Sequence, residues 1–110
     1  MIVMKFGGTS VADAASMSRT ISIVESKLSQ RPVVVVSACA KVTDTLYEII
    51  ELDHQGKKEE ALELAAALRK RHEGIVADFN GEKDASLAAI KETIASIFSR
   101  MEKLVKDNNG

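Results

Sequence analysis

The residues best suited to chemistry form one short segment near the start of the chain, Lys5-Phe6-Gly7-Gly8-Thr9-Ser10-Val11. The glycines allow backbone N–H groups to approach an oxyanion closely. A helix beginning after them would add free N–H groups and the positive end of its dipole. The ammonium group of Lys5 directly precedes this turn. Because phosphoryl transfer requires fixed positive groups around the transferred phosphate, the segment predicts a phosphate-binding site.

Each of these residues also has a purely structural explanation. Lys5 is compatible with a solvated lysine on a strand, and Thr9 and Ser10 are compatible with helix caps or turn formers. The structural and ligand-binding roles of these hydroxyls can coexist, since both place them at a helix N-terminus. The segment is not a Walker A loop, whose lysine follows the glycines, and it is not a GxGxxG dinucleotide loop.

A second candidate loop spans residues 37–41 and is flanked by Ser37 and Thr43. Capping explains these hydroxyls equally well, because Thr43 or Thr45 could begin a helix. Thr45 followed by Glu48 would itself form a capping box. From the chemistry alone, this loop is weaker evidence for a site than the glycine segment.

The two loops need elements that bring them together. Residues 2–6 and the valine run at residues 33–36 predict buried strands, and the stretch from Asp13 to about Ser29 predicts a helix. The start of this helix resembles a capping box that begins at Ser10. Residues 1–42 therefore predict a βαβ unit in which both loops follow the carboxyl end of a strand and face one crevice. The apolar stripe of the helix comprises Met17, Ile21, Val24 and Leu28.

The remainder of the chain, residues 43–107, predicts a helical segment. Asn80-Gly81 indicates a turn, so the last two helices are expected to pair as an antiparallel hairpin. The three helices run from Thr43 to about His54, from Lys58 to about Phe79, and from Asp84 to about Lys106. The stripe of the last helix comprises Leu87, Ile90, Ile94, Ile97, Met101 and Leu104, widened by Phe98 and Val105. The expected fold class is α/β.

The composition is that of an ordinary globular protein, with 110 residues, 45% hydrophobic, 28% charged and a net charge of −1. This charge gives no support for a nucleic-acid or membrane-surface partner, and no apolar run is long enough to span a bilayer. The single cysteine, Cys39, cannot form an internal disulfide and fits a reducing, cytoplasmic setting. His54 and His72 have no second ligand at metal spacing, so we expect no metal cluster.

Two strands are few for a parallel sheet, which normally has more strands and is covered on both faces. We therefore expect either that the natural protein continues past Gly110 or that the strands find neighbours by self-association. A homo-oligomer is the expected assembly.

The segment from Val3 to Val11 resembles the N-terminal signature of the aspartate kinases, with no visible departure. The stretch from Val34 to Thr43 is similar to the next conserved stretch of that family, which also places a mostly helical insertion after it. The resemblance covers the whole chain. Family members are several times longer, so we expect this chain to be an N-terminal fragment of the catalytic domain that has no activity alone.

The resemblance implies part of an amino-acid-kinase fold, which is a three-layer αβα sandwich. It also implies ATP-dependent phosphorylation of the side-chain carboxylate of L-aspartate to 4-phospho-L-aspartate, towards lysine, threonine and methionine. By position, it makes Lys5 catalytic and assigns Ser37 and Thr43 to the aspartate. ATP with Mg²⁺ would be bound by the glycine segment, namely Lys5, Phe6, Gly7, Gly8, Thr9 and Ser10.

Two alternatives stay open. The first is a fragment of another amino-acid kinase, such as a glutamate or acetylglutamate kinase, although the string from Lys5 to Val11 argues against it. The second is a non-catalytic module, either a small α/β anion binder or an oligomerising helical hairpin. The long stripe of the last helix gives this second alternative its support.

Overall fold

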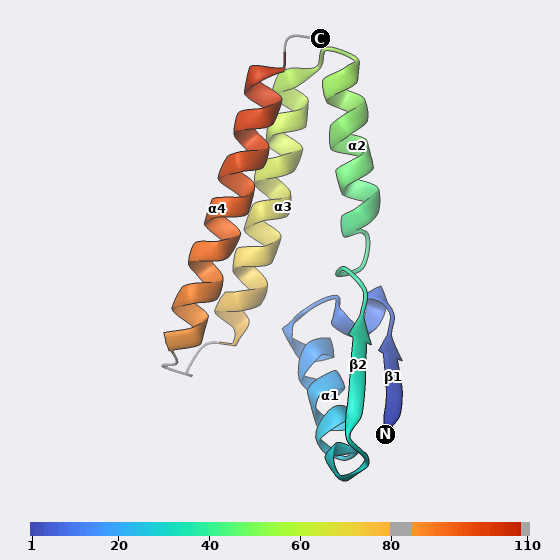
Figure 1. Ribbon diagram of the computed structural model, residues 1–110. Helices are drawn as coiled ribbons and strands as arrows, with labels where there is room; N and C mark the ends of the chain where they lie inside the picture. Colours follow the sequence, from blue (N-terminus) through green and yellow to red (C-terminus); the bar gives the residue numbers. More distant parts are fainter. Residues whose placement is uncertain (80–84, 109–110) are drawn as a thin grey trace. The chain divides into compact units, whose positions relative to one another are not determined.

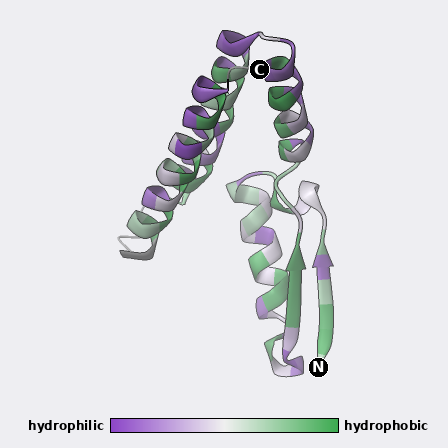
Figure 2. Ribbon diagram, turned by 45° about the horizontal axis from the view of Figure 1, so that its top comes forward, coloured by the Kyte–Doolittle hydropathy of each residue, from purple (hydrophilic) through white to green (hydrophobic). Residues whose placement is uncertain are grey.

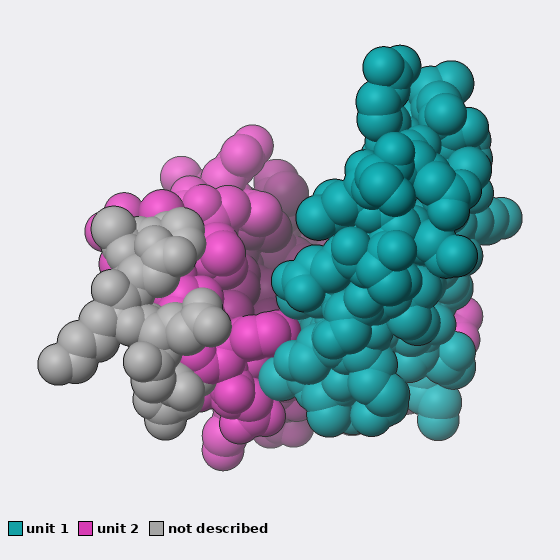
Figure 3. All heavy atoms as spheres, turned by 90° about the horizontal axis from the view of Figure 1, so that it is seen from below, with its two compact units in different colours: residues 1–43 teal, residues 44–110 magenta. Residues whose placement is uncertain are grey.

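The computed structural model describes residues 1–79 and 85–108. The chain divides into two compact units, residues 1–43 and residues 44–110, which are coloured separately in Figure 3. Both described strands belong to the first unit, and the second is helical over its described elements. This mixed α/β architecture, with a βαβ unit followed by three helices, confirms the predicted fold class.

The first unit is built on a parallel pair of strands (Figure 1). Valine favours extended backbone, and Pro32 stands at the first position of its strand, where a missing N–H is tolerated. Lys5 lies opposite Val35 in the register. The elements are β1 (Ile2–Phe6), the 3-10 helix η1 (Gly8–Val11), α1 (Ala14–Glu25), the short η2 (Leu28–Gln30) and β2 (Pro32–Val36).

Helix α1 is capped by Asp13, and the predicted capping box at Ser10 was wrong. The Oδ1 atom of Asp13 accepts a hydrogen bond of 2.7 Å from the backbone N–H of Ser16. This bond satisfies one of the free donors of the first turn. Ser10 lies inside η1 instead. The helix ends at Glu25, earlier than predicted, and the chain returns to the sheet through a left-handed Arg31 with φ of 52°.

The predicted apolar stripe of α1 is only partly covered. Met17 and Val24 are half-buried, whereas Ile21 is 49% exposed and Leu28 is 60% exposed. The valines of β2 are also 41% to 57% exposed, and Figure 2 shows the hydrophobic colour along this strand. A sheet of two strands beside one helix therefore leaves much of its apolar surface uncovered. The most buried residues of α1 are Ala14, Ser16 and Thr20.

The second unit is a helical assembly in which α3 and α4 lie antiparallel and side by side (Figure 1). This arrangement confirms the predicted hairpin. Ala61 and Ala65 are fully buried, because small side chains let a neighbouring helix approach closely. The rings of His72 and Phe98 add a contact with 5.4 Å between their centres. The helices are α2 (Val42–His54, whose first residues belong to the first unit), α3 (Lys58–Asp78) and α4 (Ala85–Asp107).

The buried face of α4 is rotated away from the predicted stripe. Phe98 and Val105, which were expected only to widen it, are buried, whereas Ile97 is 56% exposed and Leu104 is 72% exposed. Apolar residues cover a wide arc of this helix, and packing against its neighbours decides which part of the arc is covered. The predicted turn at Asn80-Gly81 and the predicted cap at Asp84 lie outside the described residues.

A lysine clamp anchors the end of α4. The Nζ atom of Lys58 donates hydrogen bonds of 2.8 Å to the carbonyl of Lys106 and 2.6 Å to that of Asn108. The side chain of Asn108 in turn donates a hydrogen bond of 2.6 Å to Asp53 of α2. A cation at this end satisfies carbonyl groups that have no partner within the helix. None of the helices in the described part of the chain has both the length and the apolar character needed to cross a bilayer.

Candidate functional site

The glycine segment forms a tight turn at the carboxyl end of β1. Gly7 has an extended backbone with φ of −78°, and its carbonyl accepts a 3.1 Å hydrogen bond from the N–H of Ser10. The chain then continues through η1, which contains Thr9 and Ser10. Lys5 is exposed on the strand that leads into the turn. Exposure leaves its ammonium group accessible to an anionic ligand.

Two backbone hydrogen bonds tie this turn to the second candidate loop. The N–H of Ser37 donates to the carbonyl of Phe6 at 3.1 Å, which extends the pairing of β1 with β2. The N–H of Ala40 donates to the carbonyl of Gly8, also at 3.1 Å. The structure therefore brings the glycine turn and the 37–41 loop together at one edge of the sheet, where ligands of open α/β sheets gather.

The adjacent glycines of the turn face different surroundings. A Cβ atom on Gly8 would lie 3.0 Å from the carbonyl oxygen of Ala38 and 3.2 Å from the Cα atom of Ala40. A Cβ atom on Gly7 would meet nothing within 4 Å. Gly8 thus favours the close approach of the two loops, because a side chain there would be crowded, whereas open space lies beside Gly7.

Thr43 and Ser37 lie on either side of the second loop. Both side chains are exposed, with Ser37 directly after β2 and Thr43 in the first turn of α2. The chain enters α2 through Lys41, whose φ of 68° is left-handed and unusual for a residue with a side chain. The helix begins at Val42, so Thr45 lies inside it and the predicted capping box at Thr45 was wrong.

The donors of this edge suit a polyphosphate. Lys5 offers a cation, and Thr9 offers a hydroxyl on an exposed residue. The space beside Gly7 leaves room for a bound group. Over residues 1–79 and 85–108, no cluster of three or more histidine, cysteine or acidic side chains is placed to hold a metal ion.

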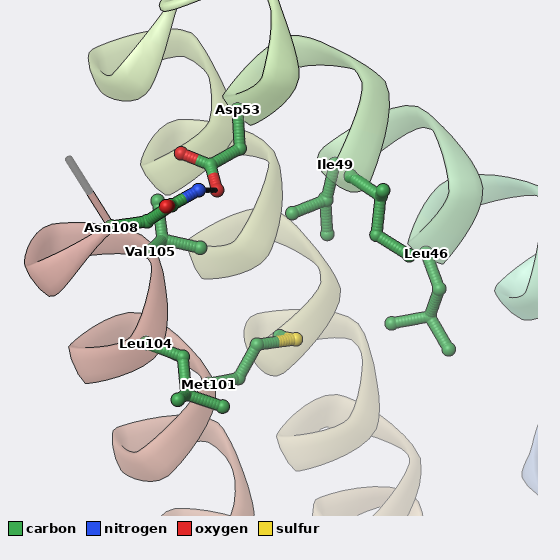
Figure 4. A pocket seen from close by; sticks show the side chains of 8 residues that line it. Leu46, Ile49, Asp53, Met101, Leu104, Val105 and Asn108 are labelled. Atoms are coloured by element: carbon green, nitrogen blue, oxygen red, sulfur yellow. Dashed lines mark hydrogen bonds between the residues drawn. The ribbon is translucent and has the colours of Figure 1, made fainter. Parts of the chain in front are cut away.

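An apolar pocket lies within the helical unit, between α2 and α4 (Figure 4). Its volume is about 450 Å³, and its lining is mostly apolar. Figure 4 shows Leu46 and Ile49 of α2 opposite Met101 and Val105 of α4, with the Asp53–Asn108 hydrogen bond at one end. This lining lacks cationic groups, so it does not suit a phosphate.

Sequence reasoning missed two residues that shape the turn, Thr20 and Ala40. Thr20 is buried, and its hydroxyl donates a 2.7 Å hydrogen bond to the carbonyl of Ser10. The available signal was its spacing, since Thr20 lies three residues after Met17 and four before Val24 on one face of the helix. Ala40 acts through its backbone N–H, which its residue type does not reveal.

Comparison with known proteins places this arrangement in a family. The model of the "Amino acid kinase family" matches residues 1–105. An aspartokinase of Chlamydia trachomatis is 40% identical over 108 residues, covering 97% of this chain and 23% of that protein. Lysine-sensitive aspartokinase 3 of Escherichia coli is 43% identical over 63 residues, covering 57% of this chain and 14% of that protein.

A chloroplastic aspartokinase 3 of Arabidopsis thaliana is 50% identical over 44 residues, covering 40% of this chain and 8% of that protein. The chain therefore spans at most about a quarter of the length of these relatives, as the 23% coverage shows. The matches confirm the resemblance to aspartate kinases that residues 3–11 indicated. The chain belongs to the amino acid kinase family.

Proposed function

We propose that this chain forms one wall of the catalytic crevice of an aspartate kinase. The observation that carries the proposal is the hydrogen-bonded union of the glycine turn with the 37–41 loop, in a chain 40% identical to an aspartokinase. Through these hydrogen bonds, the phosphate-binding turn and the second polar loop share one edge of the sheet. The reaction is phosphorylation of the side-chain carboxylate of L-aspartate, towards lysine, threonine and methionine.

In this proposal the glycine turn binds the phosphates of ATP. Backbone N–H groups of Gly7, Gly8 and Thr9 and the hydroxyls of Thr9 and Ser10 donate hydrogen bonds to phosphate oxygens, while the N–H of Ser10 keeps its bond to the carbonyl of Gly7. Lys5 contributes a positive charge that stabilises the negative charge of the transferred group. ATP, with Mg²⁺ on its phosphates, supplies the phosphoryl group and further positive charge when bound.

The second loop orients the acceptor. The hydroxyls of Ser37 and Thr43 hydrogen-bond to L-aspartate, so that a side-chain carboxylate oxygen is directed at the γ-phosphorus. That oxygen forms the new bond as the bond to the ADP oxygen breaks. Because both substrates are held at one edge in the reactive orientation, the reaction becomes effectively unimolecular and its entropic barrier falls. The isolated chain has no measurable activity, because this wall carries only part of the required contacts.

A chimera tests the proposal. The 108 aligned residues of the Chlamydia trachomatis aspartokinase are replaced by this chain, and ADP formation is measured with L-aspartate and MgATP. We expect aspartate-dependent ADP formation, and none from the isolated chain. A folded chimera without activity, or a chimera that prefers another amino acid, would contradict the assignment. The native Chlamydia enzyme serves as the positive control.

A further inference from the structure

The side chain of Thr20 behaves differently from other hydroxyls on the helices. Serine and threonine inside a helix commonly donate to the carbonyl four residues earlier. Ser22 does so towards Ser18 at 3.1 Å, and Thr93 does so towards Ala89 at 3.0 Å; both bonds are exposed. Thr20 instead leaves its own helix and donates at 2.7 Å to the carbonyl of Ser10.

The acceptor of this bond lies within the glycine turn. Ser10 belongs to η1, and its own N–H is bonded to the carbonyl of Gly7 at 3.1 Å. The bond from Thr20 therefore fixes the end of the turn against α1. Thr20 is only 8% exposed, so water cannot readily replace its hydroxyl.

The same turn is also held from its other side. The carbonyl of Gly8 accepts the N–H of Ala40, and a Cβ atom on Gly8 would lie only 3.0 Å from the carbonyl oxygen of Ala38. Two independent contacts, one from α1 and one from the 37–41 loop, thus restrain a segment of a few residues. A restrained turn loses less conformational entropy when a ligand binds.

We propose that Thr20 is a positioning residue, whose hydroxyl presets the glycine turn for phosphate binding without touching the ligand. This inference rests on the proposed function of the turn. It assigns to α1 a role in phosphate affinity beyond covering the sheet. Removing the donor takes away the part-buried hydrogen bond that links the carbonyl of Ser10 to α1.

The test compares four variants of the 110-residue chain. Thr20→Val keeps the shape and removes the donor, whereas Thr20→Ser keeps the donor. Thr20→Ala serves if valine prevents folding, since alanine is the best helix former. Ser22→Ala is the matched control, because it removes an exposed hydroxyl–carbonyl bond from the same helix.

Two NMR measurements are made on each folded variant. The first, without ligand, compares the amide shifts and hydrogen exchange of residues 7–12 and of Ala40. The second titrates inorganic tripolyphosphate and follows the amide signals of the turn. We expect Thr20→Val to disturb the ligand-free turn and to raise the dissociation constant at least about fivefold. Thr20→Ser and Ser22→Ala stay within about twofold of the wild type.

Wild-type amide signals and affinity in Thr20→Val would overturn the inference, as would an equal disturbance by Ser22→Ala. Failure of the wild-type turn to respond to tripolyphosphate would count against the proposed phosphate site. The ligand-free comparison would then still decide whether Thr20 sets the shape of the turn. The two ideas can therefore fail separately.

Discussion

The two units of the chain are stabilised in different ways. In the helical unit, Ala61 and Ala65 are fully buried, and Phe98 and Val105 are nearly so. In the first unit, the valines of β2 remain 41% to 57% exposed, and the notable contacts are hydrogen bonds between loops. All the candidate site residues therefore lie in the first unit, which buries few apolar side chains. The helical unit buries more apolar side chains and contributes no candidate site residue. The site combines hydrogen bonds between its loops with a small apolar core that includes Val11, which is 7% exposed.

The largest expected effect separates activity from stability. Lys5→Met in the active chimera should lower the rate by at least about a hundredfold, because a fixed positive charge beside the transferred phosphate is lost. Lys5 is exposed, so the free energy of unfolding should change by less than about 0.5 kcal/mol. Steady-state kinetics and denaturant unfolding measure the two quantities. Lys27→Met, at another exposed lysine of the first unit, is the control and should leave the rate unchanged.

A core substitution tests the helical side of the comparison. Ala65→Leu should destabilise the protein by about 2–3 kcal/mol, because a fully buried position has no room for added carbon atoms. Ala67→Leu on the same helix is exposed and should be nearly neutral. Chemical denaturation followed by circular dichroism gives both values. Equal effects of the two substitutions would show that Ala65 is not part of a tightly packed core.

In the first unit, the adjacent residues Gly7 and Gly8 provide a matched pair of substitutions. Gly8→Ala should cost about 1–2 kcal/mol, since its single added carbon meets the backbone of Ala38 and Ala40. Gly7→Ala should change stability by less than about 0.5 kcal/mol, because its surroundings are open and its φ suits any residue. If Gly7→Ala proved the more destabilising, the assigned packing of the two loops would be wrong. Thermal unfolding of both variants makes the comparison.

The smallest effect concerns a local cap. Asp13→Ala should lower stability by about 1 kcal/mol, because the N–H of Ser16 loses its acceptor. Asp13→Asn retains an oxygen acceptor and should recover most of the loss. Amide hydrogen exchange shows whether this effect is local. Loss of the cap should speed exchange at residues 14–17 and leave the helical unit unchanged. A loss spread over α3 and α4 would contradict this local role.

The sequence predicted the positions of the strands and the hairpin well, because the valine run and the apolar spacing of α4 are local patterns. The predicted burial of the strands was wrong, because a sheet of two strands leaves the valines of β2 41% to 57% exposed. The predicted stripes on α1 and α4 failed in part, because Ile21 is 49% exposed and Leu104 is 72% exposed. Which part of an apolar arc is buried depends on the neighbour and not on the helix itself.

The candidate site divides in the same way. Lys5 and the glycines could be found from residue type and order, because these types are characteristic of phosphate binding. Ala40 acts through its backbone, and Thr20 acts through a carbonyl ten positions earlier in the chain, as the 2.7 Å bond to Ser10 shows. Such contacts follow from the tertiary path of the chain, which a single sequence does not display.

The lysine clamp has a consequence for protein engineering. Because Lys58 holds the carbonyls of Lys106 and Asn108, a mechanical pull on the C-terminal end is transmitted to the start of α3. A fusion joint that replaced Asn108 would remove one of these anchors and the bond to Asp53. Tags, labels and chimeric junctions are therefore best attached after Asn108, so that the hydrogen bonds of Lys58 and Asn108 are retained.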